Sequence, residues 1–266
     1  MIPITKIKNI YYLREDQNIT GSAKDRAIPF QINQAIKLGY QKFVIASSGN
    51  AAISADYFCR QLNLELQVFV SPHISASKLS LIKSQVTKTT QPNSSAFKYA
   101  KQNQAFFLRQ STDPNAQIGY QKITIDILTQ LPQVTSIFLP IGSGTTLLGI
   151  SKNLPKNIKL FGVQPASSCP ICSYFDQDYT SEMKTITDAL SVKLLPNKQK
   201  IISLLKNHGG GVVVNDSEVK SCYQELLDNQ LFVSPEAGLA LAGLKKVSQS
   251  LNIGDYPLII VTGIKR

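Results

Sequence analysis

The stretch Asn18-Ile19-Thr20-Gly21-Ser22-Ala23-Lys24-Asp25-Arg26 joins a strand-like apolar run to a helix-like run. Ser22 and Asp25 have the spacing of a capping box, which predicts a helix that begins at Ser22 and carries Lys24 in its first turn. The positive end of the helix dipole and the neighbouring arginine both disfavour the ammonium form of a lysine there. Such a lysine either holds an anion or acts as a nucleophile, unless its head bends away into water.

The bulk composition indicates a globular protein. The chain has 266 residues, 43% of them hydrophobic and 17% charged, which allows one large domain or two modest ones. We find no apolar leader after the N-terminal Met-Ile-Pro-Ile-Thr-Lys and no run near the length of a membrane span, so the sequence predicts a cytoplasmic protein. The net charge of +11 is spread without basic blocks. It therefore indicates solvated surface, and we expect neither nucleic acid nor membrane as a partner.

The chain contains four cysteines, namely Cys59, Cys169, Cys172 and Cys222. Four cysteines do not make a disulfide framework in a chain of this size. Cys169 and Cys172 have the spacing of a zinc site or of a redox dithiol. Since a zinc site needs more ligands, and His73 and His208 stand apart from this pair in the sequence, the sequence favours free thiols and no metal.

Apolar runs of strand length alternate with helical stretches along the whole chain. The runs are continuous rather than alternating, which indicates strands buried on both faces and hence parallel sheets in an α/β architecture. We expect two α/β lobes that share one cleft. The predicted strands are residues 10–14, 43–46, 67–71, 106–109, 136–140, 160–164, 211–215 and 258–262.

Ligands of parallel sheets gather at the carboxyl ends of the strands, where the following helices offer backbone amides. One such end carries Ser47-Ser48-Gly49-Asn50-Ala51-Ala52, which leads into a predicted helix over residues 51–62. This loop can present several N–H donors and the Asn50 amide to a carboxylate or a ring hydroxyl. A plain helix cap would need only one of these residues.

A second strand end carries Gly142-Ser143-Gly144-Thr145-Thr146, whose glycines and hydroxyls suit a phosphate. No Gly-Lys-Ser/Thr follows, and the next strand ends in Gln164 where a dinucleotide fold would place an acidic residue. A cofactor with one phosphate is therefore favoured over NAD or ATP. Thr262, at the end of the last strand, would point a hydroxyl into the same cleft. We interpret His208-Gly209-Gly210-Gly211 as a turn into a strand, because no nucleophile elbow accompanies it.

Pyridoxal 5'-phosphate is the cofactor that needs a reactive lysine, a phosphate cradle and a neutral group opposite a ring nitrogen. Residues 13–26 resemble the lysine motif of threonine synthases among the tryptophan-synthase-β-like, fold type II, pyridoxal-phosphate enzymes. The Ser47 loop resembles the asparagine loop of these enzymes, and the Gly142 loop resembles their phosphate loop. Further motifs follow in the threonine-synthase order: Gly162–Pro165, Cys169–Ile171, Thr185–Ala189, Ser234–Ala237 and Thr262–Gly263.

The resemblance implies two three-layer αβα lobes with the cofactor in the cleft between them. We expect residues 28–133 to form a smaller, mobile, substrate-side lobe, and residues 1–27 plus 134–266 to form the larger lobe. Lys24 would be the Schiff-base lysine and general base, Asn50 would contact the ring oxygen, and Thr262 would face the pyridine nitrogen. The phosphate would bind Gly142, Ser143, Gly144, Thr145 and Thr146, and the substrate carboxylate would bind Ser47, Ser48, Gly49, Asn50 and Ala51.

The implied reaction is an elimination or replacement on a small amino acid, first of all the conversion of O-phosphohomoserine to threonine. Serine/threonine dehydratase chemistry or a cysteine-synthase-like β-replacement is the alternative, and a catalytically inactive cofactor- or ligand-binding homologue is the alternative of another class. We also expect a homodimer. The chain departs from the family pattern on the substrate side, with Asp113-Pro114 for Asn-Pro, Ile118-Gly119 for Glu-Gly, and Ser234 for the acid of a Glu-Pro pair.

Overall fold

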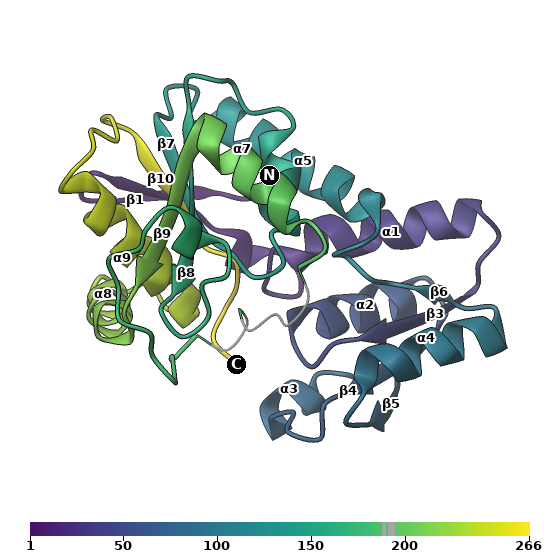
Figure 1. The fold of residues 1–266 in the computed structure, drawn as a ribbon. Helices are drawn as coiled ribbons and strands as arrows, with labels where there is room; N and C mark the ends of the chain where they lie inside the picture. The colour runs from purple at the N-terminus through teal and green to yellow at the C-terminus, as the bar shows by residue number, and fades with distance from the viewer. Residues whose placement is uncertain (188–189, 191–194) are drawn as a thin grey trace. The chain divides into compact units, whose positions relative to one another are not determined.

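The fold is taken from a computed structural model, which describes residues 1–187, 190 and 195–266 (Figure 1). The chain forms two compact units: residues 1–18 with 121–265, and residues 19–120 with Arg266. These boundaries differ from the sequence-based ones, because residues 19–27, with Lys24, group with the smaller unit. The other boundary falls inside helix α5 (Pro114–Gln130), which the sequence assigned wholly to the smaller lobe.

In the described part of the chain, the larger unit has a six-stranded sheet of order β1-β2-β10-β7-β8-β9. β1 and β2 pair antiparallel, and every other pairing in this sheet is parallel. β7 is buried along its whole length, as the continuous apolar run predicts. The strands are β1 (Ile4–Ile7), β2 (Ile10–Leu13), β7 (Ser136–Pro140), β8 (Lys159–Pro165), β9 (Gly209–Val214) and β10 (Pro257–Ile260).

Helix α9 (Pro235–Ser248) supplies much of the core of the larger unit, with residues 236–244 buried. A Cβ added at Gly243 would lie 2.6 Å from the Val163 side chain, so this glycine lets the helix lie close on β8. The other helical segments are α6 (Thr145–Ser151), α7 (Lys198–His208), α8 (Asp216–Asp228) and the 3-10 turns Glu15–Gln17 and Cys172–Tyr174.

The smaller unit has a parallel sheet of order β5-β4-β3-β6 in the residues that are described. Phe43 and Ile45 pack in the core cluster that holds buried residues of α1 and α2, whereas Val44 packs with Ala96 of α4. Helices therefore cover both faces of the sheet, which gives three layers (Figure 1). The elements are α1 (Lys24–Lys37), β3 (Lys42–Ala46), α2 (Asn50–Gln61), β4 (Glu65–Val70), α3 (Ala76–Ser80), β5 (Gln85–Lys88), α4 (Pro92–Asn103) and β6 (Phe106–Phe107).

The glycines after His208 correct one expectation. Gly209, Gly210 and Gly211 are the first residues of β9 rather than a turn that precedes it. A Cβ at Gly209 would lie 2.5 Å from the Leu160 carbonyl oxygen, so β8 and β9 approach too closely there for a side chain. Elsewhere, no helix among the described residues is both long and apolar enough to cross a membrane.

Candidate active site

Lys24 is the first residue of α1 and therefore lies in the first helical turn, as the sequence predicts. The predicted capping box is wrong. The N-cap residue is Ala23, which makes no side-chain cap bond, and the helix begins two residues after Ser22. The Ser22 Oγ instead accepts a hydrogen bond from the Lys24 backbone N–H at 3.4 Å.

The Asp25 carboxylate fastens the loop that precedes the helix. It accepts hydrogen bonds from the Thr20 backbone N–H at 2.6 Å and from the Thr20 Oγ1 at 2.5 Å. Gly21 lies between the partners at φ +74°, a left-handed conformation that glycine adopts readily. The carboxylate that a capping box would use at the helix start thus closes the turn before Lys24.

The Lys24 side chain is half-buried and points to an aromatic residue. Its Nζ donates to the Tyr120 hydroxyl at 3.3 Å and lies 5.8 Å from the centre of the Tyr120 ring. Tyr120 is fully buried on α5. Sequence reasoning missed this residue, since it belongs to none of the motifs and meets Lys24 only through the packing of two helices.

The Ser47 loop connects β3 to α2, whose first residue is Asn50. Ser47 Oγ accepts from the Gly49 N–H at 3.2 Å, and Ser48 Oγ accepts from the Ser71 N–H at 2.8 Å. Since Ser71 follows β4, Ser48 also holds the neighbouring strand end. A Cβ added at Gly49 would meet no described atom within 4 Å, so the loop has open space on that side.

Arg266 groups with the smaller unit and joins two parts of the candidate site. Its Nη1 donates to the Asn50 Oδ1 at 3.1 Å, and its Nη2 donates to the Thr20 carbonyl oxygen. Asn50 and the loop before Lys24 therefore lie within reach of one guanidinium. Burial lowers the pKa of Arg266, while the nearby Asp25 carboxylate acts in the opposite direction.

The Gly142 loop of the larger unit connects β7 to α6. Gly144 is the N-cap residue of α6, at φ +76°, and a Cβ there would lie 2.1 Å from the Ile201 Cδ1. Both facts favour glycine at this position. The Ser143 and Thr145 hydroxyl oxygens are 3.0 Å apart, and the first-turn amides of α6 have no partner within the helix by its geometry.

Thr262 follows the neighbouring strand of the same sheet. β10 runs parallel to β7, with Ile259 opposite Phe138. Thr262 and the Gly142 loop therefore both follow the carboxyl ends of neighbouring strands. The Ser234 N–H donates to the Gly263 carbonyl oxygen at 3.0 Å, which ties the start of α9 to the segment that carries Thr262.

Gln164 has a structural role beside the Gly142 loop. It is 1% exposed, its Oε1 accepts from the Ile171 and Cys172 N–H groups at 2.9 Å each, and its Nε2 donates to the Ile141 carbonyl oxygen at 3.2 Å. A position that a dinucleotide fold uses for the ribose is here occupied by an amide that binds the scaffold. Of the further motif at 185–189, Ile186 N–H donates to the Asp216 Oδ1 at 2.7 Å, and residues 188 and 189 lie outside the described residues.

Each unit, taken by itself, offers donor groups that suit pyridoxal phosphate. The smaller unit holds a half-buried amine and, beside the open side of Gly49, the Asn50 amide. The larger unit holds a glycine-tightened turn with paired hydroxyls and a threonine at the same sheet edge. Residues 3–263 match the family described as "Pyridoxal-phosphate dependent enzyme". The chain belongs to this family.

Known pyridoxal-phosphate enzymes resemble the chain in sequence and in fold. The threonine synthase of Methanosarcina acetivorans is 24% identical, over 96% of this chain and 70% of that enzyme. The biosynthetic L-threonine dehydratase of Haemophilus influenzae is 23% identical, over 96% of this chain and 53% of that enzyme, so the chain spans about half of the dehydratase. Maize serine racemase has the same fold, with a TM-score of 0.88 at 16% identity over 100% of this chain and 88% of the racemase. The predicted fold type II architecture and cofactor are confirmed.

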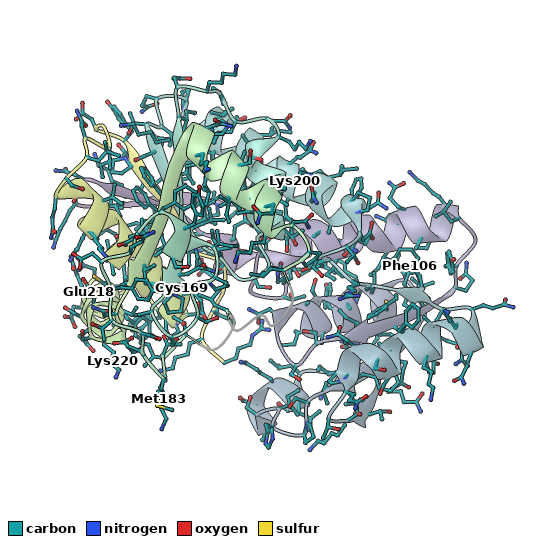
Figure 2. All side chains as sticks on the ribbon, in the orientation of Figure 1. Phe106, Cys169, Met183, Lys200, Glu218 and Lys220 are labelled. Carbon is teal, nitrogen blue, oxygen red and sulfur yellow. The ribbon has the colours of Figure 1, made fainter. Side chains whose placement is uncertain are left out.

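The four thiols of this pyridoxal-phosphate enzyme are buried and form no disulfide bond (Cys169 is labelled in Figure 2). Cys172 Sγ donates to the Gly162 carbonyl oxygen at 3.2 Å. Among the described residues, no group of three His, Cys, Asp or Glu side chains could hold a metal ion. Burial raises the pKa of Cys59 to about 12 and also raises that of Cys172, which opposes thiolate chemistry at either residue.

We expect the native protein to react very slowly with Ellman's reagent at pH 8. Burial both blocks access and suppresses the thiolate, so the rate for Cys59 should be about a hundredfold or more below that of an exposed thiol. After unfolding in guanidinium chloride, all four thiols should react rapidly with Ellman's reagent. Fast reaction of two thiols in the native protein, lost in the double variant Cys169→Ser with Cys172→Ser, would favour the dithiol interpretation.

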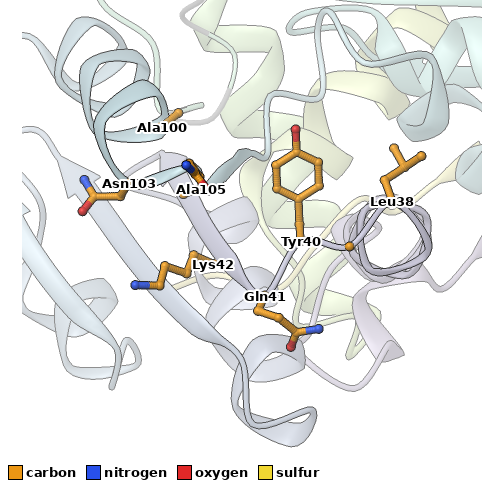
Figure 3. Close-up of a pocket in the computed structure, with 9 residues that line it drawn as sticks. Leu38, Tyr40, Gln41, Lys42, Ala100, Asn103 and Ala105 are labelled. Atoms are coloured by element: carbon orange, nitrogen blue, oxygen red, sulfur yellow. The ribbon is translucent and has the colours of Figure 1, made fainter.

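The cavity in Figure 3 is distinct from the candidate site. Its volume is about 580 Å³, and Tyr40, Gln41 and Lys42 line it together with Asn103 and Ala105. Lys42 is the first residue of β3, so the cavity lies at the amino end of this strand. The Ser47 loop leaves the opposite, carboxyl end. This hollow is therefore no part of the site that the motifs define.

Proposed function

We propose that the enzyme catalyses an elimination or replacement on a small amino acid, with O-phosphohomoserine to threonine as the leading reaction. The observation that carries this proposal is the half-buried Lys24 amine at the first turn of α1, in one unit with the Ser47 loop. Threonine synthases and threonine dehydratases are among the relatives, which supports this class of substrate. We retain a homodimer as a prediction.

Pyridoxal phosphate, when bound, supplies the electron sink for negative charge at the substrate α-carbon. In the proposed assignment, Lys24 holds the cofactor covalently and takes the α-proton as a general base. Asn50 would contact the ring oxygen. Thr262 would offer the pyridine nitrogen a hydroxyl, and an unprotonated nitrogen suits elimination or replacement more than transamination.

The remaining assignments follow the two loops. The backbone and hydroxyl donors of Gly142, Ser143, Gly144, Thr145 and Thr146 would hold the phosphate. Ser47, Ser48, Gly49, Asn50 and Ala51 would hold the substrate carboxylate, and the open space at Gly49 leaves room for it. Ser48 can do so only by donating its hydroxyl proton or its N–H, because a carboxylate only accepts hydrogen bonds. Its oxygen can accept from the Ser71 N–H at the same time.

A dehydratase is the second candidate, because a threonine dehydratase is nearly as similar to this chain as a threonine synthase is. A cysteine-synthase-like β-replacement comes next. The alternative of another class is a homologue that binds the cofactor without catalysis, and it rests on the substrate-side departures at Asp113, Ile118 and Ser234.

A substrate panel tests the proposed function. We expect O-phosphohomoserine to release phosphate with a kcat/KM at least about tenfold above that for O-phosphoserine, O-acetylserine, serine or threonine, since about 1.4 kcal/mol of differential binding suffices. Release of pyruvate or 2-oxobutyrate alone would favour the dehydratase. Racemisation alone would contradict the proposal, and an absorption spectrum that no amino acid alters would favour the binding protein.

A further inference from the structure

Three side chains of the smaller unit form a series of hydrogen-bond contacts that begins at Lys24. The Lys24 Nζ donates to the Tyr120 hydroxyl at 3.3 Å, and this hydroxyl donates to the Gln110 Oε1 at 3.4 Å. Both distances are longer than the usual hydrogen-bond ranges of about 2.7–3.2 Å for N–H···O and about 2.5–3.0 Å for O–H···O, so both contacts are weak. The Gln110 Nε2 is buried and has no hydrogen-bond partner among the described residues. No motif of the sequence contains Tyr120 or Gln110.

The packing of α5 on α1 fixes this series of contacts. A Cβ added at Gly119 would lie 2.4 Å from the Arg26 carbonyl oxygen and 2.8 Å from the Ala27 Cα, so the two backbones touch beside Lys24. A second tie joins α1 to the residue that precedes α5, since the Gln31 Nε2 donates to the Asp113 Oδ2 at 2.6 Å. The position of Tyr120 relative to Lys24 is thus set by main-chain contact rather than by flexible side chains.

The direction of the two hydrogen bonds matters chemically. The Tyr120 proton is directed to Gln110, so the hydroxyl meets the Lys24 amine as an acceptor. In its neutral form the amine would use an N–H in this contact, which leaves its lone pair free. A neutral amine needs that lone pair both to bond to an aldehyde carbon and to take a proton.

Gln110 also lies on the side of the sheet where the strands have their carboxyl ends. It follows β6, and β6 runs parallel to β3, whose carboxyl end carries the Ser47 loop. Segments that follow neighbouring parallel strands all leave the sheet at the carboxyl ends of these strands. Gln110 and the Ser47 loop therefore belong to the same end of this unit.

We propose that Tyr120, oriented by Gln110, is a positioning residue for Lys24. It holds the amine by an N–H whenever the amine is not bonded to the cofactor, and it keeps the lone pair available. The inference rests on the proposed role of Lys24 and is independent of which amino acid is the substrate.

The test follows formation of the Lys24–cofactor bond in the full chain after removal of bound cofactor. Wild type, Tyr120→Phe and Tyr40→Phe are mixed with increasing pyridoxal phosphate, and absorbance gives a half-saturating concentration and a limiting first-order rate. Tyr40→Phe is the matched control, because Tyr40 lines the cavity at the amino end of β3. We expect Tyr120→Phe to lower the limiting rate about tenfold with half-saturation unchanged, and the control to match wild type. A merely structural defect would also weaken the saturable binding step.

Gln110→Met provides a second, independent variant. Without the Gln110 acceptor, the tyrosine proton can bind the amine lone pair, so the limiting rate should fall about threefold. If Tyr120→Phe fails to fold, as judged by circular dichroism, the limiting rate of Gln110→Met decides whether the inference holds. An unchanged limiting rate in each folded variant overturns the inference. Borohydride reduction of wild type that labels no Lys24 peptide refutes the proposed function instead.

Discussion

Lys24→Ala is expected to abolish the covalent attachment of pyridoxal phosphate and to lower turnover by at least about a thousandfold, because one residue would lose both its nucleophilic and its general-base role. The fold should survive. Lys24 is half-buried, and its Tyr120 contact contributes on the order of 1 kcal/mol or less to the free energy of unfolding. Borohydride reduction followed by peptide mass mapping measures the attachment.

Lys37→Ala is the control for this prediction. Lys37 is exposed in the last turn of the same helix, so its loss changes the charge but none of the candidate site. The control should keep the label on the Lys24 peptide and keep full turnover. A wild-type label on any other lysine would refute the assignment of Lys24.

Gly119→Ala is expected to lower the free energy of unfolding by about 2–3 kcal/mol, the upper part of the range of about 1–3 kcal/mol for overpacking. The added methyl would lie 2.4 Å from the Arg26 carbonyl oxygen, and no rotamer change can move a main-chain atom away. Relief requires α5 to shift from α1, which would also move Tyr120 from Lys24. Urea unfolding measures the first effect, and the rate of cofactor attachment measures the second.

Gly49→Ala is the matched stability control. Its added methyl meets no described atom within 4 Å, so the free energy of unfolding should change by less than about 1 kcal/mol. Equal losses in the two variants would show that the cost comes from replacing a glycine in general. The contact between α1 and α5 would then have no special tightness.

The sequence predicts the interior strands of both sheets and the edge strands β6 and β9, but it misses the edge strands β1 and β5. β7 and β8 are continuous apolar runs because helices cover both of their faces. β1 and β5 went unpredicted because these two edge strands contain polar residues and have no buried residue. A short edge strand needs no apolar run, so hydrophobicity alone does not reveal it.

The candidate site divides in the same way between local and distant contributions. The loops at Ser47 and Gly142 could be proposed from the sequence because their candidate ligand-binding residues are neighbours in the chain. Tyr120 could not, since it is 96 residues from Lys24 and reaches it only through helix packing. Local rules also failed where a better partner existed, as when the Asp25 carboxylate bonded to Thr20 rather than capping α1.

The pairing of β2 with β10 means that the sheet of the larger unit can be completed only late in synthesis of the chain. Tyr11 of β2 lies opposite Leu258 of β10, and residues 19–120 of the smaller unit emerge from the ribosome between them. At about 5–20 residues per second, the first hairpin waits roughly 10–50 s for the strand that will sit beside it. The inserted unit has time to fold in that interval, whereas the hairpin of β1 and β2 must keep an open edge. Its early exposure leaves this hairpin open to mispairing with another chain until β10 is made.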